Sequence, residues 1–311
     1  MAPDDQQINS LNEVMHSQPL IDSLNEAISA ACGTECRVER LVDAHGGCIS
    51  RAVIAETTRG KWFVKINRSE LFEMFAAEAD GLRALAASPA LRVPRVACTG
   101  RNGAFTYLVL EYIDIRPLRD AHAPAAGQAL ATLHRIGGAA FGWNCDNFIG
   151  STPQTNRPCA TWPEFFARER LLPQLVRARH QGHGGRWIEA GERLAGCLHV
   201  FFADYRPQPS LVHGDLWHGN AGVDASGRLV LFDPAVYLGD RETDLAMSEL
   251  FGGFPAGFHA AYREAWPLAA GHAQRKTLYN LYHVLNHLNL FGGSYREQAE
   301  RMIGTLLAEL G

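Results

Sequence analysis

The order of apolar and polar positions divides the chain into a strand-rich part followed by a helix-rich part. Residues 20–33 show helical spacing that ends at Gly33, and residues 70–87 show it again. Short runs rich in β-branched and aromatic residues predict strands at Val38–Val42, Ile49–Thr57, Lys61–Ile66, Val93–Cys98 and Phe105–Tyr112. Pro94 limits the fourth run to a strand start or an edge. The resulting order, β-β-β-α-β-β, predicts an antiparallel sheet with one key helix.

From about residue 114 onward the helical period dominates. The predicted helices cover residues 124–136, 162–180, 186–204, 242–252, 257–265, 272–291 and 295–310. Two short apolar stretches, Ser210–Val212 and Arg228–Phe232, lie between them, and each leads into polar residues. Residues 152–158 and 182–185 are predicted to be loops. We therefore predict an α+β fold with two lobes, residues 1–113 and residues 114–311, of which the second is mainly α-helical.

Composition and charge narrow the class of protein. The chain has 311 residues, 47% of them hydrophobic and 20% charged, and a net charge of -4, which gives no basic excess for binding nucleic acid. No apolar run approaches the roughly 18 residues that a membrane span needs, and the N-terminus is polar. The seven cysteines are odd in number and scattered. We expect a cytoplasmic protein with free thiols and with neither a membrane nor a nucleic acid as partner.

One polar motif has the spacing of a kinase catalytic loop. His213, Asp215 and Asn220 match the pattern His-x-Asp-x-x-x-x-Asn, and Asp233 follows the apolar stretch that ends at Phe232. Phosphoryl transfer from ATP needs an acceptor for the hydroxyl proton and ligands for Mg²⁺ beside the phosphates. The spacing predicts Asp215 as the catalytic base and Asn220 and Asp233 as the ligands of Mg²⁺.

A lysine lies inside a strand whose other residues suit burial. Lys65 is part of Trp62–Ile66, and a buried lysine requires an anionic partner. Glu78 lies on the apolar stripe of the next predicted helix, so we predict a Lys65–Glu78 ion pair that directs the lysine to the ATP phosphates. Glu73 is an alternative partner. In another interpretation Lys65 extends to solvent and Glu78 lies at the helix edge.

Two further segments of the predicted nucleotide-binding lobe are candidates for contact with ATP. Gly46 and Gly47 lie between two strands, where their backbone could approach the phosphates, although an ordinary hairpin turn also fits. The neighbouring Cys48 is either sensitive to oxidation or simply a buried thiol. Glu111 and Ile113 lie at the end of the last strand, where a hinge backbone would bind adenine.

Several longer segments carry a family resemblance. They are Leu211–Asn220, Phe232–Tyr237, Gly239–Met247, Leu250–Phe254 and Leu278–Gly293. With Gly46–Cys48 and Lys65, residues 20–305 resemble the fructosamine kinase (ketosamine 3-kinase) family. The resemblance implies a protein-kinase-like fold of the aminoglycoside phosphotransferase type and phosphorylation of the C3 hydroxyl of a ketosamine. It also implies that the unstable product eliminates phosphate and frees the amine, a deglycation repair. Two departures stand out: Asp233–Ala235 replaces Asp-Phe-Gly, and His218 occupies a position that is often Ser.

The acceptor side is predicted from the helix at residues 272–291 and from Trp217. Tyr279, His283, Asn286 and His287 gather on one face of that helix and could hydrogen-bond a sugar, with Trp217 as a flat aromatic surface, although a solvated face also fits. Little chain separates Asp233 from the next helix, so a small ketosamine or a glycated lysine side chain fits better than a protein segment. The acidic residues between 240 and 244 suit helix capping or an ion-pair scaffold.

Alternatives to a ketosamine kinase stay open at this point. The same chemistry could act on an aminoglycoside, on choline or on a sugar. A pseudokinase that binds nucleotide without catalysis is a rival from another class, although Lys65, Asp215, Asn220 and Asp233 form a complete set. We expect a monomer or a weak homodimer. Nine histidines, His134 among them, receive no role.

Overall fold

The structure, a computed structural model, describes residues 17–44 and 50–310. These residues form two compact units. The first contains the described residues up to Ala84 together with Val93–Asp114, and the second contains Leu85–Arg92 together with the rest of the chain from Ile115. Among the described residues, no helix is both long enough and apolar enough to cross a membrane.

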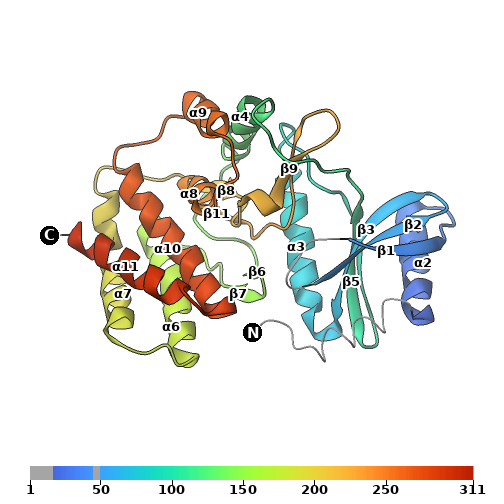
Figure 1. The fold of residues 1–311 in the computed structure, drawn as a ribbon, viewed down its shortest axis with the longest axis horizontal. Coiled ribbons are helices and arrows are strands. Elements are labelled where there is room, and N and C mark those ends of the chain that lie inside the picture. Colours follow the sequence, from blue (N-terminus) through green and yellow to red (C-terminus); the bar gives the residue numbers. More distant parts are fainter. Residues whose placement is uncertain (1–16, 45–49, 311) are drawn as a thin grey trace. The chain divides into compact units, whose positions relative to one another are not determined.

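The first unit is built on an antiparallel sheet of five strands in its described part, in the order β1-β2-β3-β5-β4 (Figure 1). The strands are β1 (Val38–Asp43), β2 (Arg51–Thr57), β3 (Gly60–Arg68), β4 (Val96–Asn102) and β5 (Phe105–Glu111). The helices are α2 (Gln18–Cys32) and α3 (Phe72–Leu85), and the 3-10 turn η1 (Ser69–Leu71) precedes α3. The antiparallel sheet and the place of α3 between β3 and β4 agree with the predicted order β-β-β-α-β-β.

Alternation along β3 decides which helix each side chain meets. Trp62, Val64 and Ile66 join a buried cluster with Leu20 and Leu24 of α2. Because successive side chains of a strand point to opposite faces, the residues between them point to the other face, which α3 covers (Figure 1). The sequence pattern thus places a polar group on the α3 side of the sheet without disturbing the apolar layer beneath α2.

The second unit is mainly helical. Its α-helices are α4 (Ala123–Leu133), α5 (Trp162–Phe165), α6 (Leu172–His180), α7 (Arg186–Gly196), α8 (Glu242–Leu250), α9 (Ala256–Ala265), α10 (His272–Phe291) and α11 (Tyr295–Ala308). A π-helical turn, η2 (Phe166–Leu171), joins α5 to α6, and the 3-10 turns are η3 (Leu198–Phe202) and η4 (His218–Asn220). The long helix α10 packs against α6, α8 and α11, so its side chains form the centre of this unit (Figure 1).

Short strand pairs lie among these helices and carry the polar loops. The pairs are β6 (Asn147–Ile149) with β7 (Thr152–Gln154), β8 (Ser210–Val212) with β11 (Tyr237–Gly239), and β9 (Ala221–Val223) with β10 (Leu229–Leu231). Tyr237 pairs with Val212 and Gly239 pairs with Ser210. The residues that follow β8 and those that precede β11 therefore meet at one end of this pair.

Several predicted elements differ from the observed ones, and three of the differences are the following. The fourth strand begins at Val96 and not at Val93, because Pro94 lacks the N–H that a strand pair needs. The single helix expected over residues 186–204 is α7 followed by the 3-10 turn η3. Residues 152–154, expected to be loop, form strand β7.

Candidate functional site

The loop after β8 depends on one glycine. Gly214 has φ 82°, a left-handed backbone conformation in which a side chain is strained. A Cβ atom at this position would also collide with the Ala235 carbonyl oxygen. Glycine therefore lets the chain turn sharply between His213 and Asp215 while the strand-end residues of β11 approach it.

Asp215 lies within this turn and is held by Asn220. The Asn220 Nδ2 donates to the Asp215 backbone oxygen at 2.9 Å and to its carboxylate Oδ2 at 3.1 Å. Burial and the nearby charge of Asp233, opposed by the hydrogen bond from Asn220, together raise the pKa of Asp215 to about 7. A carboxyl group with a pKa near neutrality can accept a proton at physiological pH.

His213 ties this turn to the segment that carries Asp233. Its Nε2 lies 2.9 Å from the Phe232 carbonyl oxygen, and its Nδ1 lies 3.3 Å from the backbone N–H of Asp215. A carbonyl only accepts and a backbone N–H only donates, so Nε2 carries the proton and Nδ1 accepts. Burial lowers the pKa of His213, which keeps the ring neutral. The histidine is a structural link between two polar segments.

A buried aspartate of α8 holds the same turn through hydrogen bonds to its backbone. Asp244 accepts the backbone N–H of His213 at 2.7 Å and that of Gly214 at 2.9 Å. His134, at the end of α4, lies with its Nε2 3.0 Å from Asp244 and its Nδ1 2.8 Å from the hydroxyl of Tyr262. Burial raises the pKa of Asp244, but the hydrogen bonds from His134 and from the backbone N–H of His213 hold it below its ordinary value. His134 has no role that its sequence position indicates. Its role as a support for Asp244 follows only from their contact in the structure.

Asp233 follows β10 in an uncommon backbone conformation. Its φ is 55°, and among the described residues it is the only one other than glycine with a positive φ. Asn220 Nδ2 also approaches the Asp233 backbone oxygen at 3.5 Å. Because Asn220 makes these contacts through Nδ2, its amide oxygen is the atom that suits a cation. An amide oxygen and a carboxylate are hard oxygen ligands of the kind that Mg²⁺ prefers, and a cation here would offset the repulsion between Asp215 and Asp233. The residues therefore fit Mg²⁺.

The first unit contains the predicted ion pair. Lys65 Nζ lies 2.8 Å from Glu78 Oε1, and the two side chains are 11% and 12% exposed. This contact confirms the pair and excludes Glu73, which is exposed, as its replacement. Glu111 ends β5, where its backbone N–H donates to the Arg95 carbonyl oxygen at 2.8 Å. Ile113, in the segment after β5, is half-buried, while Gly46, Gly47 and Cys48 lie outside the described residues.

Comparison with known proteins agrees with this geometry. The family model described as fructosamine kinase matches residues 20–309. A protein of Synechocystis sp. named "Probable ketoamine kinase" is 44% identical over 282 residues, which are 90% of this chain and 95% of that protein. The chain belongs to the fructosamine kinase family. A protein-ribulosamine 3-kinase of Arabidopsis thaliana, chloroplastic by name, is 38% identical over 282 residues, 89% of this chain and 86% of that protein.

Solved structures extend the likeness to the fold. A Thermobifida fusca protein assigned as a fructosamine-3-kinase superposes with a TM-score of 0.82 and 33% identity, covering 93% of this chain and 99% of that one. The aminoglycoside phosphotransferase APH(4)-Ia, in complex with ADP and hygromycin B, gives a TM-score of 0.62 at 17% identity, with 92% and 97% covered. The predicted protein-kinase-like fold of the aminoglycoside phosphotransferase type is thus confirmed for this member of the fructosamine kinase family.

The residues predicted for the acceptor separate into a surface pair and a buried pair. Trp217 is half-buried and its ring centre lies 6.5 Å from that of Phe251, which in turn lies 4.8 Å from His287. His283 and Asn286 are 3% and 2% exposed, so the inner part of this face of α10 is not solvated. Asn286 accepts a hydrogen bond from a buried residue of α6, and burial lowers the pKa of His283 to about 3. Phe251 lies between Trp217 and His287, and sequence reasoning assigned it no role of its own. Its only sequence signal was its place in the family segment Leu250–Phe254.

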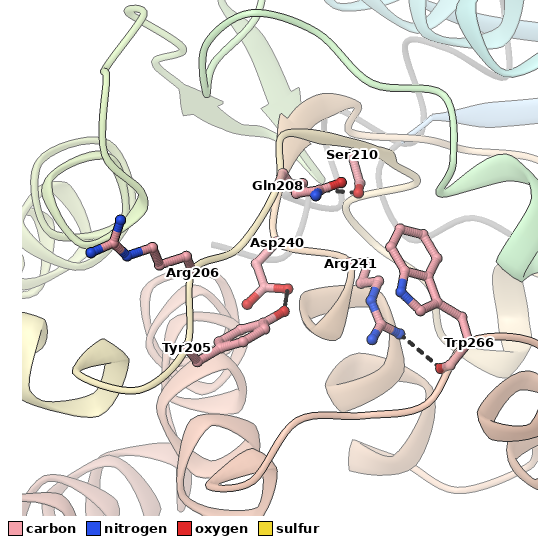
Figure 2. A pocket seen from close by; sticks show the side chains of 7 residues that line it. All are labelled: Tyr205, Arg206, Gln208, Ser210, Asp240, Arg241 and Trp266. Atoms are coloured by element: carbon pink, nitrogen blue, oxygen red, sulfur yellow. Dashed lines mark hydrogen bonds between the residues drawn. The ribbon is translucent and has the colours of Figure 1, made fainter.

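A small cavity of about 120 Å³ lies elsewhere in the second unit (Figure 2). It is lined by Tyr205, Arg206, Gln208, Ser210, Asp240, Arg241 and Trp266. Ser210 begins β8 and Asp240 follows β11, so the cavity lies at the opposite end of this strand pair from the catalytic turn. The Asp240 carboxylate already accepts the hydroxyls of Tyr205 and Tyr279 and the backbone N–H of Glu242. Asp240 therefore has a structural role at the start of α8, as expected for an acidic residue that caps a helix.

Proposed function

We propose that this protein transfers the γ-phosphoryl group of ATP to the C3 hydroxyl of ketosamines, the adducts that form when a sugar glycates an amine. Membership of the fructosamine kinase family supports the reaction, and the name of the Arabidopsis relative supports position 3 and a ribulose-derived sugar on a protein. The single observation that carries the proposal is the half-buried Asp215 carboxylate held by Asn220 beside Asp233.

In this proposal Asp215 receives the proton of the acceptor hydroxyl. Its pKa, raised by burial to about 7, makes it a far better base than an ordinary aspartate, whose conjugate acid is much stronger. Asn220 fixes the carboxylate, so that one oxygen is oriented by the bond to Nδ2 while the other is available to the substrate. Positioning of this kind, more than covalent chemistry, is what phosphoryl transfer requires of a protein.

Several residues are proposed to bind the nucleotide and its metal ion. Asn220 and Asp233 would hold Mg²⁺, which neutralises phosphate charge when bound. Lys65, fixed by Glu78, would contact the phosphates, since a lysine already oriented by an ion pair loses little freedom on binding. The backbone of Glu111 and Ile113 is proposed to bind adenine, and the approach of Gly46 and Gly47 to the phosphates stays a prediction.

The acceptor is proposed to lie against Trp217 and His287. Phe251 bridges these two side chains, so that together they offer a partly exposed aromatic edge beside the catalytic turn. Sugars bind well where a flat aromatic surface lies beside hydrogen-bonding groups. His283 and Asn286 are buried beneath this edge and would act by supporting it or by meeting the part of the sugar that reaches inward.

Release of ADP from Mg-ATP tests the function directly. We expect turnover with ribulosyl-lysine or fructosyl-lysine and none with kanamycin or choline. Activity confined to kanamycin or choline would replace the proposed acceptor, whereas nucleotide binding without any turnover would identify a pseudokinase.

A matched pair of variants tests the base. Asp215→Asn should lower kcat by roughly 100-fold to 10,000-fold while nucleotide affinity stays nearly unchanged, because the proton acceptor is lost and the metal ligands remain. Asp224→Asn, in the turn between β9 and β10, is the control for the same chemical change and should keep near-normal turnover. Normal turnover in Asp215→Asn would exclude Asp215 as the base.

A further inference from the structure

Side-chain donors form hydrogen bonds with backbone carbonyl oxygens on both sides of Asp233. His213 Nε2 donates to the Phe232 carbonyl oxygen at 2.9 Å, and Asn220 Nδ2 approaches that of Asp233. Beyond Asp233 the donors come from the β6–β7 hairpin. Gln154 Nε2 donates to the Ala235 carbonyl oxygen at 3.2 Å, and Asn147 Nδ2 donates to that of Val236 at 2.7 Å.

The two hairpin amides are fixed by a buried network. Tyr282 donates its hydroxyl to Gln154 Oε1 at 2.6 Å, and a hydroxyl hydrogen on that side leaves the Gln154 nitrogen facing Ala235. Gln154 Nε2 also donates to Asn147 Oδ1 at 2.8 Å. Asn147 and Gln154 are 5% and 2% exposed, so neither amide can turn to water for another partner.

The orientation of every amide in this network follows from one arginine. Arg170, in the π-helical turn η2, is fully buried and donates through Nη2 to Asn156 Oδ1 at 2.7 Å. Since arginine only donates, Asn156 must present its oxygen there and its nitrogen to Asn147 Oδ1, 3.0 Å away. Asn147 accepts on that side, so its own nitrogen faces Val236. The direction of donation is therefore set from Arg170 through two asparagines to the backbone beyond Asp233.

This network also accounts for an otherwise unusual buried cation. Within residues 17–44 and 50–310, Arg170 has no ion pair. Its guanidinium carbon lies 4.0 Å from the ring centre of Tyr237 and 4.7 Å from that of Phe165, and its other acceptors are neutral carbonyl oxygens. A buried charge without a counter-charge is costly. Arg170 is useful at this position despite the cost, because a group that can only donate fixes the direction of the hydrogen bonds that follow it.

We propose that Asn147 and Gln154 are positioning residues that clamp the backbone after Asp233 and keep this proposed metal ligand in its left-handed conformation. A residue other than glycine holds a positive φ only where the surrounding structure enforces it. The carbonyl oxygens of Ala235 and Val236 are the points at which the hairpin enforces it. The proposal rests on the proposed function only in treating Asp233 as a metal ligand.

The test compares two buried glutamines changed in the same way. Gln154→Met removes the donor to Ala235, whereas Gln174→Met, in α6, removes an amide that is also buried but reaches the clamp only through the hydroxyl of Tyr282. Tyr282→Phe is a milder second variant, because it removes only the hydroxyl that is bonded to Gln154 Oε1. Two readouts on the full chain avoid turnover: hydrogen–deuterium exchange of residues 232–240, and Mn²⁺ binding with ADP by electron paramagnetic resonance.

We expect Gln154→Met to speed exchange over residues 232–240 by at least about tenfold and to weaken Mn²⁺ binding by about 10-fold to 100-fold, roughly 1.4 to 2.8 kcal/mol at 1.4 kcal/mol per decade. Tyr282→Phe should shift both in the same direction by less, and Gln174→Met, which reaches the clamp only through Tyr282, should shift neither by more than Tyr282→Phe does. Equal behaviour of Gln154→Met and Gln174→Met in both readouts would overturn the clamp. If the unaltered protein binds no Mn²⁺ with ADP, the proposed metal site fails, and the exchange comparison alone decides on the clamp.

Discussion

Replacing Asp244 by asparagine tests how strongly the catalytic turn depends on α8. The carboxylate accepts three buried N–H groups: the backbone of His213 at 2.7 Å, the backbone of Gly214 at 2.9 Å and His134 Nε2 at 3.0 Å. An asparagine keeps one accepting oxygen and turns an NH₂ group toward the remaining donors. At least one charge-assisted hydrogen bond is then replaced by two donors that face each other.

The size of the effect follows from these contacts. A hydrogen bond to a charged group contributes about 1.5 to 3 kcal/mol, and a buried donor left without an acceptor costs about 1 to 3 kcal/mol more. We therefore expect Asp244→Asn to lower the free energy of unfolding by about 3 to 5 kcal/mol, a large part of the roughly 5 to 15 kcal/mol of an ordinary domain. Because the turn that carries Asp215 loses its support, kcat should fall as well.

Urea unfolding followed by tryptophan fluorescence measures the loss, with Glu249→Gln as control. Glu249 lies on the same helix and forms an ion pair with Lys276 at 2.8 Å, but these side chains are 32% and 37% exposed, so this change should cost no more than about 1 kcal/mol. Asp244 has a pKa below its ordinary value, so its stabilisation is complete above that value and declines as the pH falls below it. The reasoning is refuted if Asp244→Asn and Glu249→Gln lower stability equally at pH 7.

Two further changes probe charges outside this anchor. Glu78→Gln removes the carboxylate 2.8 Å from Lys65 Nζ, which should destabilise the protein by about 2 to 4 kcal/mol and lower kcat/KM for ATP by about 100-fold; an unchanged Tm and kcat/KM would argue against the ion pair. Asp224 accepts hydrogen bonds from the Ser226 hydroxyl, the Arg92 side chain and the Arg228 backbone N–H, which hold its pKa at about 2, below its ordinary value. Asp224→Asn should therefore cost about 1 kcal/mol at pH 7 and progressively less between pH 4 and pH 2. Urea unfolding at pH 7 and pH 3 measures this, and an equal difference at both pH values would contradict it.

Local patterns carried enough information for the parts of the fold and site that lie close together in sequence. The Lys65–Glu78 pair follows from the two-residue period of a strand and the apolar stripe of the next helix, since both periods fix a direction in space. Asp215 and Asn220 share one turn, so their spacing alone brings them into contact. The strand β4 was misplaced at its start for an equally local reason, because the effect of Pro94 extends to its neighbours.

Residues whose partners lie far away in the chain could not be found in this way. Asn147 and Gln154 lie in a segment rich in polar residues and proline, which favours a loop whether or not the amides are used. Their acceptors, the carbonyl oxygens of Val236 and Ala235, lie more than 80 residues away, and a backbone carbonyl leaves no trace in a sequence. His134 was missed for the same reason, because nothing near it signals Asp244.

Helix α10 shows why a polar face alone does not predict exposure. The spacing of His283, Asn286 and His287 is equally compatible with water, with a substrate or with another polar helix. The structure places Gln174 of α6 against Asn286, so the inner part of this face is buried among amides, while His287 alone of the three remains half-buried beside Phe251. Asn286 uses its amide oxygen to accept from Gln174, and its 2% exposure leaves a sugar hydroxyl little access to the rest of the amide. The contribution of this face to acceptor choice should therefore come mainly from His287 and Trp217, with Asn286 fixing the helix on which His287 is carried.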